Sequence, residues 1–289
     1  MKTNLISLLL IGTLLMEGSC YKEDIVNPPI KTVEPSTDPI DQYIQTNFTD
    51  KYGIAVRYKF VDRYVDQTKR VTPPERDLVE PMLRFLNSMW VEPFISVKSG
   101  KKFFSTHVPA EIIFIGSTIY NQDGTVTLGV ADAGARITLT EVNDIDTTSQ
   151  HWVYRQVGTI YHEFAHIVHQ RYNLPPNWQK ISPQGYTSPG SWYNLTDDDA
   201  LKRGFVSPYG TSSFNEDFAE FVAFLLYRPD FYEVFMNDEA NCVSADCVAR
   251  NEGRAKLRAK YTAVLALYQT NTGVDLLAVR EIVQQKLPK

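Results

Sequence analysis

One helix-patterned segment, residues 147–170, most strongly limits how this chain can fold. Its apolar residues recur at the three- and four-residue spacing of an α-helix and form one stripe: Val153, Val157, Ile160, Tyr161, Phe164 and Val168. Thr147 and Gln150 have the T-x-x-Q spacing of a capping box, which predicts that the helix begins there. A helix with a single apolar stripe packs that face against a core, and its flanks can carry polar residues.

The same helix carries the motif HEFAH, in which His162 and His166 are four residues apart. Four residues advance a helix by about 6 Å and about 40°, so both imidazoles lie together on the flank of the stripe. Such a pair can bind one Zn²⁺ ion, and Glu163 is then placed to accept a proton from metal-bound water. The alternative is a polar edge on a buried helix. Because the motif is short enough to arise by chance, a third ligand elsewhere has to decide.

A second helix-patterned segment, residues 207–228, supplies candidates for that ligand. Its apolar residues cover most of its sides, while Glu216 and Glu220 stand one turn apart in a single stripe. A carboxylate entering a low dielectric needs a metal, a cation or strong hydrogen bonds. We therefore expect Glu216 to be the third ligand and Glu220 to accept the free N–H of a ligating histidine. The alternative for Glu216 is a capping box with Ser213, which leaves Glu220 unexplained.

The remaining histidines have weaker patterns. His169 shares the helix face of the motif, but it lies about 10 Å along the axis from His162. We expect it to lie behind the ligands or to face solvent. His107 and His151 show no partner pattern.

The N-terminus has the organisation of a targeting signal. Residues 5–16 form an apolar run that is too short to span a bilayer, and small residues precede Cys20. This arrangement resembles a bacterial lipoprotein signal, with residues 1–19 removed and Cys20 carrying the lipid. Residues 20–40 then form a proline-rich tether.

A charged run, residues 21–24, follows the lipidation candidate. It resembles the signal that sends some lipoproteins of the Bacteroidetes to the outer face of the outer membrane, which implies a lipid-anchored protein at the cell surface. The alternative is a solvated charged tether.

Composition and cysteine usage exclude some classes of protein. The chain has 289 residues, a formal net charge of −5 and no Lys/Arg-dense stretch, so no nucleic-acid partner is expected. Cys242 and Cys247 form an even pair, and outside the cytoplasm we expect a disulfide rather than two free thiols. Residues 236–256 supply no histidine and no further cysteine for a zinc knuckle.

The chain beyond the tether predicts an α+β fold in one domain, residues 41–289, without internal repeats. A sheet-containing part, 41–145, precedes a helical part, 146–289. The expected elements are helices over 39–49 and 72–90 and strands over 55–64, 111–117, 125–131 and 135–142, with a turn at 121–124 between the second and third strands.

A tyrosine preceding the second helix adds to the site pattern. HEFAH, then Tyr209-Gly210, then a glutamate seven residues after the tyrosine and another four later, resembles gluzincins of the lethal-factor type. This resemblance implies that Tyr209 stabilises the oxyanion of the reaction. Because the chain has sixteen tyrosines, a packed tyrosine is the alternative.

The order of motifs along the chain resembles one family more closely. A lipoprotein signal, a proline-rich tether, HExxH, G-F-V-S-x-Y and E-D-F-A-E are similar to the substrate import-associated zinc metallohydrolase lipoproteins of Bacteroidetes. The resemblance implies a zincin-like metallopeptidase domain with a small mixed sheet and a helical C-terminal part. It also implies a zinc cofactor, a link to TonB-dependent nutrient uptake and membrane attachment through the lipid alone.

Together these patterns predict a zinc-dependent metallopeptidase acting on a peptide or protein. Zinc held by His162, His166 and Glu216 would activate water for Glu163. The strand over 135–142 is interpreted as the edge strand along which a peptide adds to the sheet. The alternatives are a zinc hydrolase of a non-peptide amide or ester and a non-catalytic binding lipoprotein of the uptake complex.

Overall fold

The computed structural model describes residues 35–61, 68–120, 126–127, 129–132, 136–188 and 190–289. The signal, Cys20 and most of the tether lie outside these residues, as does the turn expected at 121–124. The fold described below belongs to the unit Thr37–Lys289. Among the described residues, no helix combines the length and apolarity needed to cross a lipid bilayer.

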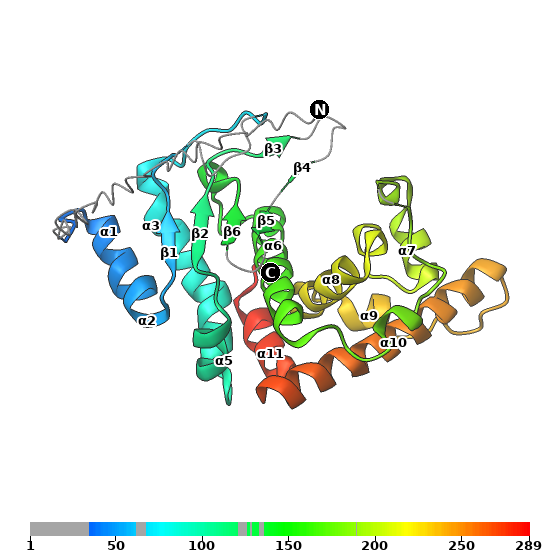
Figure 1. The fold of residues 1–289 in the computed structure, drawn as a ribbon. Coiled ribbons are helices and arrows are strands. Elements are labelled where there is room, and N and C mark those ends of the chain that lie inside the picture. The colour runs from blue at the N-terminus through cyan, green and yellow to red at the C-terminus, as the bar shows by residue number, and fades with distance from the viewer. Residues whose placement is uncertain (1–34, 62–67, 121–125, 128, 133–135, 189) are drawn as a thin grey trace, which may run out of the picture. The chain divides into compact units, whose positions relative to one another are not determined.

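The N-terminal half alternates short helices with strands (Figure 1). Its helical segments are α1 (Pro39–Ile44), η1 (Gln45–Thr49), α2 (Asp50–Tyr52), α3 (Arg76–Leu86), η3 (Asn87–Val91), α4 (Glu92–Ile95) and α5 (Gly100–His107). Asp38 caps α1, since its carboxylate accepts the N–H of Ile40 at 2.9 Å. The helix expected over 39–49 is confirmed and continues to Tyr52.

The helix expected from residue 72 begins only at Arg76, and it continues through π and α turns to Ile95. Two prolines follow Thr72, and a residue before proline is disfavoured in the α region. Thr72 instead joins the loop after the second strand, because its carbonyl accepts the N–H of Gly116 at 2.8 Å.

Four short strands form a mixed sheet in the order β1-β2-β6-β5, and two more form a separate ladder (Figure 1). β1 (Ala55–Arg57), β2 (Glu111–Phe114) and β6 (Arg136–Leu139) are parallel, whereas β5 (Gly129–Asp132) runs antiparallel to β6. The ladder pairs β3 (Ile119–Tyr120) with β4 (Val126–Thr127). The strand expected over 55–64 therefore ends at Arg57, and the one expected over 125–131 contributes to two different sheets.

The strand over 135–142 was interpreted as the sheet edge, and this is wrong. β6 pairs with β2 on one side and β5 on the other, so its backbone groups are used on both sides. The edge strands are β1 and β5, and no strand in the described part of the chain pairs with the far side of β5. A sequence pattern identifies strands but leaves their lateral order undetermined.

Alternating residues of the strands separate two apolar clusters. Ile112 and Ile137 join the main core beneath the helices. Ile113 and Ile115 point to the opposite face, where they pack with Ile119. This period-two alternation is the signature of a sheet with apolar residues on both faces.

Helix α6 (Gln150–Tyr172) is the central element, and it packs against β5 and β6 and against α8 (Phe214–Tyr227). Its N-cap is Ser149, whose Oγ accepts the N–H of Trp152 at 3.3 Å. The capping box expected at Thr147 is therefore wrong. Asp146 forms its own turn, accepting hydrogen bonds from the N–H and hydroxyl of Thr148, and this turn delays the helix start.

Gly158 of α6 faces the ring of Tyr227 of α8. A Cβ at Gly158 would stand 3.2 Å from that ring, which would then have to move by a few tenths of an ångström. Glycine thus favours the close approach of the two helices. This approach positions the flank of α6 opposite the stripe of carboxylates on α8.

The C-terminal half is helical around this pair (Figure 1). Its remaining segments are η4 (Val142–Asp144), η5 (Trp178–Lys180), η6 (Trp192–Asn194), α7 (Asp197–Arg203), η7 (Tyr209–Ser212), α9 (Phe231–Phe235), α10 (Ala245–Thr272) and α11 (Leu276–Lys286). A disulfide joins Cys242 to Cys247 at the start of α10. The α+β class, with a small mixed sheet, an HExxH helix and a helical C-terminal part, is as predicted.

A buried ion pair fixes α8 to α10. Lys260 is fully buried, and its Nζ donates to Asp217 Oδ1 and to the carbonyl of Gly204, both at 2.7 Å. Asp217 also accepts the hydroxyl of Tyr186 at 2.7 Å. These hydrogen bonds compensate the desolvation of both charges and hold the start of α8 in place.

Candidate metal centre

Three side chains from α6 and α8 bring their donor atoms together. His162 Nε2 lies 3.0 Å from His166 Nε2 and 3.0 Å from Glu216 Oε2. The third separation, from His166 Nε2 to Glu216 Oε2, is 3.2 Å. The two histidines are adjacent because they are one turn apart on α6, and Glu216 reaches them across the α6–α8 contact.

This donor set fits a zinc ion. A tetrahedral ion with bonds of about 2.0–2.1 Å separates its ligands by about 3.3–3.4 Å, only slightly more than the distances observed. His162 Nδ1 lies 2.8 Å from Glu220 Oε1, so an N–H there donates to the carboxylate. The lone pair of a neutral His162 then points from Nε2 toward the oxygen of Glu216. A cation between the three atoms removes this repulsion between acceptors.

Without a metal ion, a proton serves the same purpose. Burial disfavours the imidazolium, but hydrogen bonds to Glu216 and Glu220 and the charge of Glu163 outweigh it, raising the pKa of His162 to about 10. Burial likewise disfavours the Glu216 carboxylate, yet His162 and His166 hold its pKa well below the ordinary value. The pocket is therefore strongly biased toward positive charge at its centre.

Glu216 does not cap its own helix with its side chain. Ser213 is the N-cap, and its Oγ accepts the N–H of Glu216 at 3.2 Å. The carboxylate of Glu216 instead faces both histidines. Of the two hydrogen bonds of a capping box, the one from the Glu216 N–H to Ser213 is present. It leaves the Glu216 carboxylate available as a ligand.

Glu163 and Tyr209 lie next to the three donor atoms His162 Nε2, His166 Nε2 and Glu216 Oε2, which we call the donor triangle. Glu163 is buried, and its charge contributes to the raised pKa of both His162 and Tyr209. The Tyr209 ring lies 5.9 Å from that of His162 and retains 38% exposure. Burial and the charges of Glu216, Glu220 and Glu163 raise the pKa of Tyr209 well above its usual range, so its hydroxyl stays protonated.

His169 lies behind the ligands. Its Nε2 is 2.8 Å from His166 Nδ1, so one ring donates to the other. Burial and the neighbouring His166 lower the pKa of His169 to about 4, which leaves it neutral near pH 7. His169 therefore orients His166 in the way that Glu220 orients His162, and neither role requires a metal bond.

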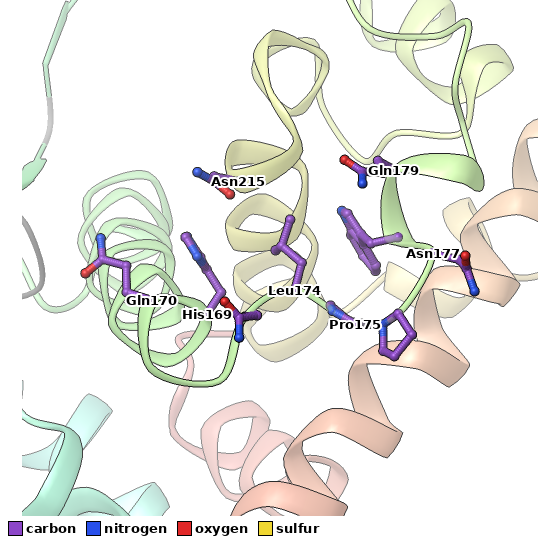
Figure 2. A pocket seen from close by; sticks show the side chains of 10 residues that line it. His169, Gln170, Leu174, Pro175, Asn177, Gln179 and Asn215 are labelled. Atoms are coloured by element: carbon purple, nitrogen blue, oxygen red, sulfur yellow. The ribbon is translucent and has the colours of Figure 1, made fainter.

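A pocket of about 560 Å³ lies beside His169 (Figure 2). It is lined by His169 and Gln170 from α6, by Asn177 and Gln179 beyond the helix end, and by Asn215 from α8. Its neutral amide side chains contrast with the charged donor triangle. His166 presents Nε2 to the other two donor atoms and Nδ1 to His169, so this pocket adjoins the side of His166 that faces away from those donor atoms.

Two features of the surroundings have no clear signal in the sequence. Trp192 packs edge-on against Tyr209, with ring centroids 5.0 Å apart, and its neighbour Tyr193 is exposed. Ser207 donates to Glu220 Oε2 at 2.5 Å.

His107, which showed no partner pattern, is a buried core residue whose Nε2 lies 2.8 Å from the hydroxyl of Tyr172.

An α+β fold with two histidines of an HExxH helix and a glutamate of a second helix around one point defines a zinc metallopeptidase type of protein. A family model agrees with this class. The model described as "Putative zinc-binding metallo-peptidase" matches residues 33–277, and the chain belongs to this family.

A solved structure supports the same assignment. The crystal structure of a "putative zinc-binding metallo-peptidase" from Bacteroides caccae, at 2.10 Å resolution, is 27% identical in sequence. The match covers 86% of this chain and 91% of that one, with a TM-score of 0.69. No curated protein matches the sequence.

Proposed function

We propose that this protein is a zinc-dependent peptidase that hydrolyses peptide bonds. The observation that carries the proposal is the convergence of His162 Nε2, His166 Nε2 and Glu216 Oε2 at 3.0–3.2 Å, next to the buried Glu163, whose charge acts on His162. Its family and the Bacteroides caccae neighbour bear the same description.

Each side chain then has a role in hydrolysis. His162, His166 and Glu216 hold the zinc ion, which, when bound, lowers the pKa of water and polarises the scissile carbonyl. The Glu163 carboxylate accepts the proton of the attacking water and delivers it to the leaving amine. Tyr209, kept protonated, donates its hydroxyl to the developing oxyanion.

The substrate backbone would be held along β5. Of the two edge strands, this is the one that packs closely against α6, the helix that bears the histidines. An extended peptide that adds to a sheet edge gains main-chain hydrogen bonds independently of its sequence. The Trp192 ring packs against Tyr209, and it would offer apolar contact area to substrate side chains near the centre.

The test of this function is digestion of a peptide library by the zinc-loaded protein, with Glu163→Gln as the matched control. We expect cleavage by the wild type and none by the variant, with equal zinc content. Hydrolysis of amide or ester model compounds without any peptide cleavage would replace the peptidase by a non-peptide hydrolase. Bound zinc without turnover of any substrate would indicate a binding lipoprotein.

We also propose that the protein is a lipoprotein anchored through Cys20 in the outer membrane, facing outward, where it serves TonB-dependent nutrient uptake as a substrate import-associated zinc metallohydrolase. The support is the signal pattern of residues 1–19 and the charged run after the cysteine. Cys20→Ala should abolish partition into detergent, because acyl chains supply the membrane affinity. Protease added to intact cells should degrade the wild type and spare a variant with Lys22, Glu23 and Asp24 changed to alanine; equal protection of both would contradict surface display.

A further inference from the structure

Ser207 occupies a position that the proposed mechanism does not use. It lies between α7 and η7, is almost fully buried, and makes two hydrogen bonds. Its Oγ donates to Glu220 Oε2 at 2.5 Å and accepts the backbone N–H of Gly210 at 3.1 Å. We infer that Ser207 is a positioning residue with two effects. Through Glu220 it sets the tautomer of His162, the proposed metal ligand, and through Gly210 it fixes the position of the Tyr209 turn relative to His162. This inference rests on the proposed function.

The chemistry of the groups fixes which atom donates in each hydrogen bond from Gly210 through Ser207 and Glu220 to His162. A backbone N–H only donates, so Ser207 Oγ accepts from Gly210 and has one proton left for Glu220. An ionised carboxylate only accepts, so Glu220 Oε1 requires a donor on His162 Nδ1, 2.8 Å away. When His162 is neutral, its single proton is thereby held on Nδ1, and the lone pair of Nε2 would be available to a zinc ion.

The same hydroxyl connects the two functional elements of the centre. Gly210 follows Tyr209 in η7, and His162 belongs to α6. Ser207 and Glu220 connect them. Glu220 Oε1 accepts from His162, and Glu220 Oε2 accepts from Ser207. A shift of the turn that carries Tyr209 is therefore transmitted to the ring of His162, and both are fixed before substrate arrives.

A hydroxyl is the group that this connection requires. Alanine at position 207 leaves the Gly210 N–H and one oxygen of Glu220 without their partner in a buried site. Cysteine keeps the size but donates and accepts weakly. Loss of such an outer partner of a metal ligand lowers metal affinity about 10- to 100-fold.

Zinc affinity, measured by competition with a chelator, tests the inference without any substrate. We expect Ser207→Ala to weaken zinc binding about 10- to 100-fold and Ser207→Cys to weaken it less. Glu220→Gln should weaken zinc binding to a similar extent once the affinities are corrected for the proton that zinc displaces from His162, and the double variant should then lose no more than the larger single loss, because both residues act through one chain of hydrogen bonds. Ser212→Ala is the matched control: Ser212 donates to the carbonyl of Tyr209 in the same turn but does not contact Glu220.

Activity gives a second readout. At saturating zinc, Ser207→Ala should lower kcat with little change in KM, whereas Ser212→Ala should leave both unchanged. Thermal unfolding shows whether each variant is folded, and Ser207→Cys remains informative if the alanine variant is not. Wild-type zinc affinity in both Ser207 variants, or multiplicative losses in the double variant, would overturn the inference. If the wild type binds zinc but cleaves no peptide, the proposed function fails while the affinity results still decide the role of Ser207.

Discussion

Zinc binding should depend steeply on pH, because the metal replaces a proton on His162. In the metal-free protein the pKa of His162 is raised to about 10, after burial is outweighed by Glu216 and Glu220. The stability from this protonated ring is fully present below the unfolded value of about 6.5 and is lost as pH rises through about 10. Zinc must displace this proton at neutral pH.

The size of the effect follows from the same pKa. At pH 7 the proton is held about three pH units below its pKa, which weakens apparent zinc affinity about 1000-fold, or about 4 kcal/mol. Apparent affinity should therefore rise about tenfold per pH unit between pH 7 and 9. The competition assay at pH 7, 8 and 9 measures this slope, and calorimetry in buffers of different ionisation enthalpy counts the proton released.

A matched variant tests the cause. Glu220→Gln removes one of the carboxylates that raise the pKa of His162, so its affinity should level off at a lower pH than that of the wild type. An affinity that is independent of pH between 7 and 9 would refute the proton-replacement reasoning. The reasoning would also be refuted if apparent zinc affinity rose with pH over the same pH range in the variant as in the wild type. The pKa of His162 would then not depend on Glu220.

Four further substitutions test individual residues. Glu216→Ala should remove most bound zinc, measured by metal analysis, because two imidazoles leave the ion half-coordinated; full occupancy would show that another residue is the third ligand. Glu163→Gln should retain zinc and lose hydrolysis by several orders of magnitude, since the amide cannot accept a proton; unchanged turnover would remove Glu163 from the mechanism. Tyr209→Phe should retain zinc and lose about 2–4 kcal/mol of transition-state stabilisation in kcat, and an intact rate would leave Tyr209 a packing residue. Lys260→Met should lower the free energy of unfolding in urea by about 3–5 kcal/mol, because Asp217 is left as a buried unpaired charge; a loss below about 1 kcal/mol would contradict the need for this pair.

Local features of the site were predictable from sequence. The three- and four-residue spacing of apolar residues marks α6, and the same helical geometry places His162 beside His166, because both depend only on residues within a few turns. Glu216 and Glu220 were identified because carboxylates in a largely apolar helix require partners. The α+β class followed from the alternation of strand and helix patterns over the N-terminal half.

Other features depended on tertiary packing. Which strands form the edges of the sheet depends on how the strands pair side by side. The sequences of β5 and β6 do not show which of the two lies at the edge. The start of α6 shifted because Asp146 forms a competing turn, an outcome that depends on local hydrogen bonds of similar strength.

The sequence by itself determined the helix that bears HEFAH, the adjacency of its two histidines and the chemistry of the donor types. The contacts of Glu216 and Glu220 with those histidines were predicted from the sequence, but only the tertiary structure established them, and it alone showed which atom His169 faces and that Ser207 joins Glu220 to the Tyr209 turn. The physical reason is range: helix geometry is fixed by neighbouring residues. Contacts between residues about fifty positions apart exist only because α6 and α8 pack together, with Gly158 allowing the approach.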